Sequence, residues 1–176
     1  MPKWPKQNKR RKSNGAEYVD WANEAIYNDD VVGQLQGYVS LDRRMIKTVQ
    51  HPRGFESCDF LTPDDRLVHV KRLDDSVAAS HLFNQAANSA EALTRQPDAK
   101  EKFREKVYEI SAGKRVLPEN FRPKAIVLAF AGRSASPDDL FTFSQVSLSR
   151  CAQQINGVGL TLEIAQINES DEIVAS

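Results

Sequence analysis

An uninterrupted apolar run, KAIVLAFAG at residues 124 to 132, limits the folds open to this chain more than any other feature. Side chains alternate between the two faces of a strand, so a strand without polar positions has to be covered on both faces. Central strands of sheets that carry packed helices have this property. The run therefore predicts a sheet flanked by helices, in the α/β or mixed α+β class.

Hydrophobic periodicity predicts the elements around this strand. Apolar residues at helical spacing predict helices over residues 17–27, 76–95, 100–110 and 141–159. β-Favouring residues bounded by turn residues predict strands over residues 35–49, 55–61, 66–73 and 160–167. The resulting order is α-β-β-β-α-(α)-β-α-β, which indicates a mixed sheet with helices on its faces.

The length of 176 residues and the hydrophobic content of 40% indicate one globular domain, expected over residues 16–168. The segments on either side, 1–15 and 169–176, are expected to be a flexible basic arm and a flexible end. The net charge of zero is the sum of a basic first segment and an acidic remainder. Residues 1–12 carry six basic side chains and no acid, which leaves 18 basic against 24 acidic residues in the rest.

The basic arm allows two interpretations. It is either a solubilising linker or expression remnant, or a disordered tail that binds phosphate backbones through charge alone. In the second case Arg72 and His81, on the domain itself, are predicted to join the arm in binding nucleic acid. The residues of the arm concerned are Lys3, Lys6, Lys9, Arg10, Arg11 and Lys12.

Two cysteines, Cys58 and Cys151, lie far apart and outside any CxxC pattern. This usage argues against a disulfide framework and favours a reducing, cytoplasmic location. No apolar run in the sequence is long enough to span a bilayer, so no membrane partner is expected. The sequence also lacks the motifs GxSxG, GxGxxG and HExxH and a Walker-type loop, which leaves those enzyme classes without support.

A predicted hairpin, FESCDFLTPDDRLVHVKR at residues 55 to 72, collects charged side chains where apolar ones would be more stable. His69 and Lys71 share one face of its second strand, because side chains alternate along a strand. The acid that joins them depends on the register. With a four-residue loop Glu56 lies opposite Lys71, and with a three-residue loop or a bulge Asp59 lies opposite His69.

Phosphoryl transfer is the chemistry that uses carboxylates together with a lysine in this way. A hard divalent cation, Mg²⁺ or Mn²⁺, binds carboxylate oxygens, and a lysine activates water or stabilises developing negative charge. Asp59, Glu56 and His69 are therefore the predicted metal ligands, and Lys71 is the predicted catalytic lysine. Imidazole suits Mn²⁺ or a later metal better than Mg²⁺, so His69 is either a ligand of a softer cation or a proton acceptor.

Two further alternatives remain for this position. In the first, Asp59 and Glu56 bind the metal together with Glu24 of the first predicted helix. In the second, the site is degenerate, and the fold binds its partner without cleaving it. In a purely structural interpretation, Glu56 and Lys71 form a cross-strand ion pair that contributes little stability at an exposed position.

The segment Asp59…His69-Val70-Lys71 resembles the motif of the PD-(D/E)xK superfamily, the restriction-endonuclease-like nucleases. The predicted α-β-β-β-α-β order over residues 17–131 is similar to the core of that superfamily. The resemblance implies metal-dependent cleavage of nucleic acid. Gln85 on the following helix is similar to a glutamine of RecB-like nucleases that helps to position the site. The chain departs from the motif at His69, where the superfamily has Asp or Glu.

A more specific resemblance covers residues 17–167. The pattern FESCDFL…LVHVKRL…SHLFNQAANSAEAL is similar to the C-terminal part of a sporadically distributed bacterial family of unknown function. The chain departs from that family at Ala86, where the family has Gly. The resemblance implies that the HxK form is the family's own version. It also implies a role in defence against phage or mobile DNA, and a chain that is one of a split pair or the C-terminal half of a longer protein. A homodimer is a further expectation for the oligomeric state.

Two functions are therefore expected. One is a metal-dependent nuclease acting on DNA rather than RNA, with Asp59, His69, Lys71 and Gln85 in the active site. The other is a non-catalytic module of the same fold that binds nucleic acid or a protein partner.

Overall fold

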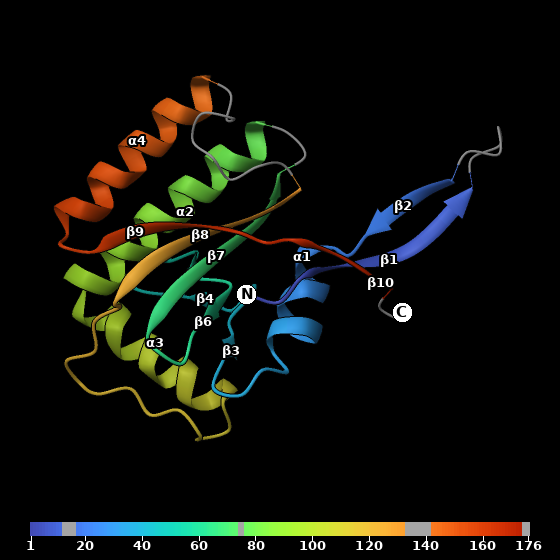
Figure 1. Cartoon of the computed structure of the whole chain (residues 1–176). Coiled ribbons are helices and arrows are strands. Elements are labelled where there is room, and N and C mark those ends of the chain that lie inside the picture. Colours follow the sequence, from blue (N-terminus) through green and yellow to red (C-terminus); the bar gives the residue numbers. More distant parts are fainter. Residues whose placement is uncertain (12–16, 74–75, 133–141, 174–176) are drawn as a thin grey trace.

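The computed structural model describes residues 1–11, 17–73, 76–132 and 142–173. Its centre is a five-stranded sheet in the order β3-β6-β7-β8-β9 (Figure 1). The strands β7, β8 and β9 run parallel, whereas β3, β6 and β7 are antiparallel neighbours. The bounds of the five strands are Val39–Ser40, Phe60–Leu61, Arg66–Leu73, Ala125–Gly132 and Thr161–Gln166.

Strand β8 lies where the sequence predicts a fully covered strand. All of its residues except Gly132 are buried, and it pairs with β7 on one side and β9 on the other. The prediction of a central strand is confirmed, and the molecule belongs to the mixed α+β class.

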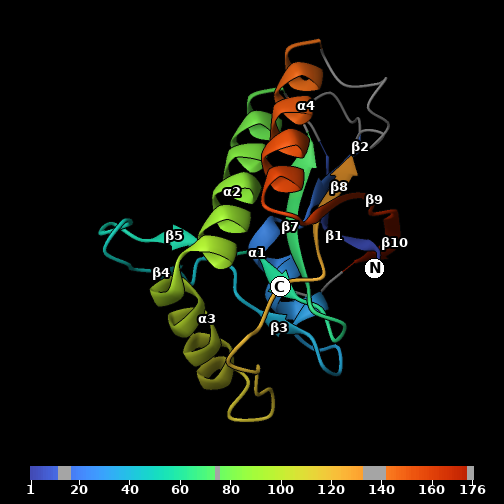
Figure 2. The same cartoon turned by 90° about the vertical axis from the view of Figure 1, so that its left-hand side faces the viewer.

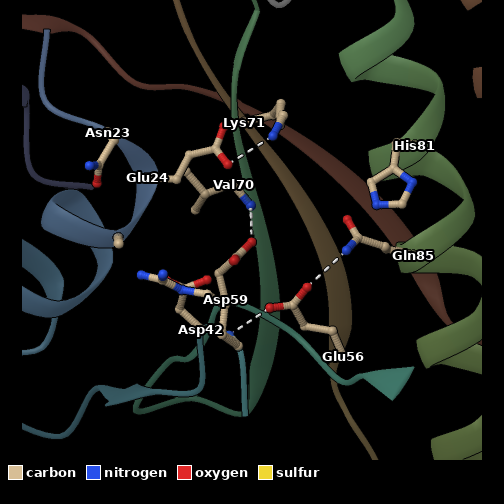
Figure 3. A pocket seen from close by; sticks show the side chains of 11 residues that line it. Asn23, Glu24, Asp42, Glu56, Asp59, Val70, Lys71, His81 and Gln85 are labelled. Carbon is tan, nitrogen blue, oxygen red and sulfur yellow. Dashed lines mark hydrogen bonds and ion pairs between the residues drawn. The ribbon is translucent and has the colours of Figure 1, made fainter. Parts of the chain in front are cut away.

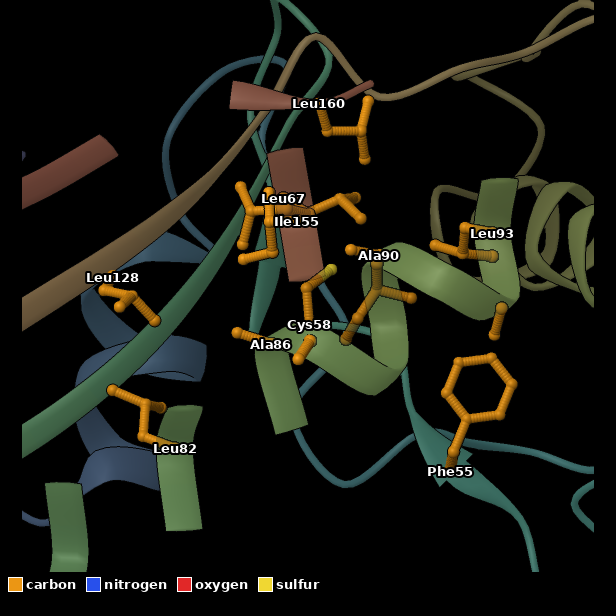
Figure 4. Packing of buried hydrophobic residues seen from close by; sticks show 14 of the residues in the cluster. Phe55, Cys58, Leu67, Leu82, Ala86, Ala90, Leu93, Leu128, Ile155 and Leu160 are labelled. Carbon is orange, nitrogen blue, oxygen red and sulfur yellow. The ribbon is translucent and has the colours of Figure 1, made fainter. Parts of the chain in front are cut away.

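Two helices, α2 (Ser76–Arg95) and α4 (Thr142–Gly157), lie side by side over one face of the sheet (Figure 2). A third helix, α3 (Pro97–Ile110), follows α2 after a single residue. The alanines Ala86 and Ala90 of α2 are fully buried and bring the helix close to the strands (Figure 4). Leu67 of β7 and Ile155 of α4 belong to the same apolar core. The helices are those predicted from periodicity.

The opposite face of the sheet is covered by the N-terminal part of the chain. Val68 and Val70 of β7 pack there against Trp4 and Tyr27. The Trp4 and Tyr27 rings stack with centroids 4.5 Å apart, and the Trp4 indole N–H donates to the carbonyl oxygen of Ala22 at 2.8 Å.

The structure corrects the predictions of a flexible arm and a flexible end. Parts of both segments form strands of a second sheet, in the order β10-β1-β2. Strand β1 (Trp4–Arg11) is antiparallel to β2 (Glu17–Trp21) and parallel to β10 (Glu169–Ile173). The ladder therefore joins segments from both ends of the chain. Lys12 and the rest of residues 12–16 lie outside the described residues.

The predicted helix over residues 17–27 is wrong in its first half. EYVDW forms β2, because pairing with β1 overrides an ambiguous helical spacing. The helix begins only after Asn23, whose side-chain oxygen accepts the N–H of Ile26 at 3.0 Å. Helix α1 (Glu24–Ile26) continues directly into the π-helix η1 (Tyr27–Val32).

The predicted strand over residues 35–49 is also wrong in extent. Only β3 and β4 (Met45–Ile46) are strands, and a turn separates them, with Arg43 in the left-handed region at φ 55°. Strand β4 pairs with β5 (Phe55–Glu56) in a separate two-stranded sheet. The predicted strand 55–61 is thus divided between β5 and β6. Within the described residues, no helix has the length and apolarity that a membrane-spanning helix needs.

Candidate metal centre

A cleft of about 400 Å³ opens at the edge of β7, between α1 and α2 (Figure 3). It exists because β6 has only two residues, which leaves one edge of the next part of β7 without a neighbouring strand, while β8 pairs along the other edge. The side chain of Asp59 occupies this gap, and its Oδ2 accepts the backbone N–H of Val70 at 2.6 Å. The Asp59 carboxylate therefore accepts a backbone N–H at an edge of β7 that has no strand partner at this point.

Three carboxylates from separate segments meet in the cleft. Asp42, Glu56 and Asp59 each offer an oxygen, and these oxygens lie within 4.8 Å of one another. Such a group of oxygen ligands suits a hard divalent cation. The register of the hairpin brings this about, because Phe60 lies opposite Val68 and Asp59 therefore precedes the paired region.

Glu56 is fixed from two sides. Its Oε1 accepts the backbone N–H of Arg43 at 2.7 Å, and its Oε2 accepts the Gln85 Nε2 at 2.8 Å. Gln85 comes from α2 and Arg43 from the turn before β4, so three elements determine the position of this carboxylate. The structure thus brings Gln85 to the acids, as expected from the sequence.

Asp59 lies close to three other carboxylates. Burial raises its pKa well above the ordinary value, and the neighbouring Glu56, Asp42 and Glu24 raise it further, although the Val70 N–H opposes this. A bound cation would reverse this destabilisation of the carboxylate.

Asn28, which is fully buried on η1, donates its Nδ2 to the Asp59 Oδ1 at 3.3 Å. The Asn28 Oδ1 is buried and has no hydrogen-bond partner. Both Asp59 oxygens therefore accept a hydrogen bond from the protein, which restricts the orientation of the carboxylate.

Lys71 reaches the same cleft from β7 and forms an ion pair with Glu24, with Nζ and Oε2 2.8 Å apart. Both side chains remain partly exposed, at 26% and 33%. Glu24 thus lies against the lysine instead of within the group of three acids. The cleft combines a candidate cation site with a separate positive charge.

His69 does not belong to this constellation, which corrects the prediction that it shares a cation site with Asp59. The residue is 1% exposed and alternates along β7 with the buried Val68 and Val70. It is not among the residues that line the cleft or form the carboxylate group. Burial lowers the pKa of His69 from 6.5 to about 4, and its Nε2 has no hydrogen-bond partner. It is a neutral histidine of the sheet interior.

The predicted nucleic-acid-binding residues are dispersed. His81 lines the cleft, but Arg72 lies over the Trp21 ring at 4.7 Å and pairs with Glu169 at 2.8 Å. Lys6 lies over the same ring at 5.7 Å. Lys3 is exposed before β1, and Lys9, Arg10 and Arg11 are within that strand. Arg72 therefore does not face the carboxylates.

Two members of the site are absent from the sequence-based prediction, Asp42 and Asn28. Asp42 belongs to the tight turn in which the Arg44 N–H donates to the Leu41 carbonyl oxygen at 3.0 Å. The Leu41 N–H in turn donates to the Asp59 carbonyl oxygen at 2.7 Å, which brings Asp42 next to Asp59. The polar run LDRR inside a predicted strand was the available signal for this turn.

A comparison with protein-family models matches residues 3–168 to a family described as a family of unknown function, DUF6119. The chain belongs to the DUF6119 family. No curated protein and no solved structure matches this sequence. The family description names no activity, so the function has to be argued from the cleft.

Proposed function

We propose that this DUF6119 chain is a divalent-metal-dependent nuclease that hydrolyses phosphodiester bonds, in DNA rather than RNA. The observation that carries the proposal is the meeting of Asp42, Glu56 and Asp59 within 4.8 Å in a cleft that also contains Lys71. Carboxylates of this kind hold Mg²⁺ or Mn²⁺, and a nearby lysine supplies positive charge for an anionic transition state.

The division of roles follows from the contacts. Asp59, Glu56 and Asp42 would hold the cation, which polarises the phosphoryl group and lowers the pKa of bound water. Lys71 would stabilise the charge that develops on the phosphoryl oxygens. Glu24 orients Lys71, and Gln85 acts as a positioning residue because it holds Glu56. Water attacks phosphorus as the bond to the leaving oxygen breaks.

The arrangement of strands supports a relationship to the PD-(D/E)xK superfamily. An antiparallel β3-β6-β7 unit is followed by helices and then by β8, which is parallel to β7. In this proposal Asp59, before β6, would be the acid of the motif, and Lys71, on β7, would be its lysine. The acid expected at His69 is replaced in this account by Asp42 and Glu56, whose oxygens reach the cleft from the turn and from β5.

The biological setting is part of the same proposal. Two buried free cysteines, Cys58 and Cys151, agree with a reducing cytoplasm. Defence against phage or mobile DNA would make use of a nuclease, and such a protein would act as a homodimer or with a partner chain.

Cleavage assays test this function. Wild-type protein is incubated with plasmid DNA and with DNA and RNA oligonucleotides, in Mg²⁺ or Mn²⁺. Lys71→Ala and Asp59→Asn are each expected to reduce the rate at least roughly a hundredfold, the scale on which loss of one electrostatic group acts. Lys114→Ala and Asp30→Asn, at exposed positions, are the matched controls. Failure to cut any substrate, or equal cutting by Lys71→Ala, contradicts the proposal and favours a non-catalytic binding module.

A further inference from the structure

The β4–β5 hairpin is attached directly to the carboxylate cleft. Asp42 precedes it, and Glu56 is paired with Met45 at its base. Figure 2 shows β4 and β5 extending away from the body beside α2. A molecule bound along the hairpin would therefore be held next to the three acids.

The hairpin is strongly basic within a chain whose net charge is zero. Residues 43–55, here called the basic hairpin, contain no carboxylate and four exposed cationic side chains: Arg43, Arg44, Lys47 and Arg53. Arg43 also lines the cleft. Arg43 pairs with Asp42, with Nε and Oδ2 3.2 Å apart, so Arg44, Lys47 and Arg53 are the cations of the hairpin that lie beyond the acids.

The neighbouring helix does not cancel this charge. Helix α3, on which the hairpin packs, carries four acidic and four basic side chains. Glu109 interacts electrostatically with Arg44, but its carboxylate is already paired with Lys106 at 2.7 Å. Among the described residues, Lys47 and Arg53 form no ion pair and Arg44 shares Glu109 with Lys106, so these three cations carry the charge that is left for a partner.

The basic hairpin is also held in place. Ile46 and Phe55 are buried in the main core, and the His51 ring packs on Phe55 with centroids 4.9 Å apart. Two polar contacts tie the loop to α3: the Lys102 Nζ donates to the Lys47 carbonyl oxygen at 2.7 Å, and the Val49 N–H donates to Asp98 at 3.2 Å. A fixed arm binds a ligand with little loss of conformational entropy.

We propose that the basic hairpin is a phosphate-backbone clamp, which holds a nucleic-acid duplex so that one phosphodiester lies over the carboxylate cleft. This inference rests on the proposed nuclease function and assigns its substrate class. Strand β4 ends at Ile46, and the chain from Met45 to the loop at Val49 reaches at most roughly 13 Å, at about 3.3 Å per residue. The major groove of DNA is about 12 Å wide, so a hairpin of this reach is long enough to contact the backbones on both sides of the groove. A duplex is therefore the proposed ligand.

Fluorescence anisotropy tests the clamp with a labelled DNA duplex in EDTA, where metal-dependent cleavage is absent. The hairpin variant is Arg44→Ala/Lys47→Ala/Arg53→Ala. Its control, Arg95→Ala/Lys114→Ala/Arg150→Ala, removes the same charge from exposed positions on other segments. The hairpin variant is expected to bind at least roughly tenfold more weakly than the control, and its salt slope is expected to fall by about 2 to 3. Matching thermal midpoints establish that both variants are folded.

The outcomes separate this inference from the proposed function. Equal binding by the hairpin variant and the control would overturn the clamp even if the wild type cuts DNA. Hairpin-dependent duplex binding by a wild type that never cuts would support the clamp and refute the nuclease. Binding of single-stranded DNA as tight as duplex binding would overturn the assigned substrate class. Tighter binding of duplex RNA than of duplex DNA would support the clamp and identify the duplex as RNA.

Discussion

Asp59 and His69 have opposite surroundings although both belong to the hairpin that the sequence singles out. Asp59 lies at an open strand edge, where the Val70 N–H and the Asn28 amide hold its carboxylate toward other acids. His69 lies on the buried part of the neighbouring strand and is neutral. The position of His69 two residues before Lys71 in the sequence therefore does not show that it shares a site with Lys71. Of the two, only Asp59 is therefore a proposed cation ligand.

His69→Leu is expected to remove an acid-dependent loss of stability. The folded-state pKa of about 4 lies below the ordinary value of 6.5, so the unfolded chain takes up this proton first as the pH falls. The stabilisation is present above pH 6.5 and is lost toward pH 4. At pH 4.5 the loss of stability relative to pH 7 amounts to about 2 to 3 kcal/mol.

Urea unfolding at pH 7 and pH 4.5 measures this difference. The drop in free energy of unfolding between the two pH values should be smaller for His69→Leu than for the wild type. His81→Gln, at an exposed histidine, should keep the wild-type drop. An unchanged drop in His69→Leu, or a loss of Mn²⁺ binding, would show that the histidine is not a neutral core residue.

Asp42→Asn is expected to weaken Mn²⁺ binding at least roughly tenfold, the scale on which changes around a metal site act. Asp42 is a member of the carboxylate group, so an amide in its place removes one charge from the cation site. Isothermal titration calorimetry measures the affinity, with Asp30→Asn as the control at an exposed acid. Equal affinities in the two variants would place the cation elsewhere.

The elements that the sequence predicts correctly are those determined by local pattern. Strand β8 and helix α2 have long, uniform patterns, and their bounds lie close to the predicted ones. Strand β1 depends instead on pairing, with β2 on one side and with β10, more than 150 residues away in the sequence, on the other. No local pattern contains that information, so a basic segment resembles a flexible arm.

The same distinction holds for the candidate site. Glu56, Asp59, Lys71 and Gln85 belong to a continuous stretch of hairpin and helix and could be predicted together. Asp42 reaches the site through a turn at a left-handed residue and Asn28 through a π-helix. Both are irregular features that periodicity does not reveal.

The close approach of α2 to the sheet makes Ala86→Leu destabilising. Ala86 is 0% exposed, so the larger side chain overpacks the core and is expected to cost about 1 to 3 kcal/mol. Urea unfolding measures the loss, and Asn84→Leu on the exposed side of α2 is the control. A stability equal to that of the control would mean that α2 does not pack on the strands through its alanines.

Trp4, at the start of the first strand, packs against the second face of the central sheet. Trp4→Ala is expected to cost about 3 to 5 kcal/mol, because the ring is fully buried and stacked on Tyr27. Lys3→Gln, at the exposed residue beside it, should leave the thermal midpoint unchanged. A Trp4→Ala protein as stable as the wild type would restore the interpretation of this segment as a flexible arm.

At the scale of the whole molecule, a cation is expected in the carboxylate cleft, where the turn before β4 and the start of β6 meet the edge of β7. Anomalous diffraction from a crystal soaked in Mn²⁺ tests this most directly. The account predicts one strong peak bonded to the carboxylates of Asp59, Glu56 and Asp42, and none at His69. A cleft without a peak, or an ion coordinated by the His69 imidazole, would contradict it.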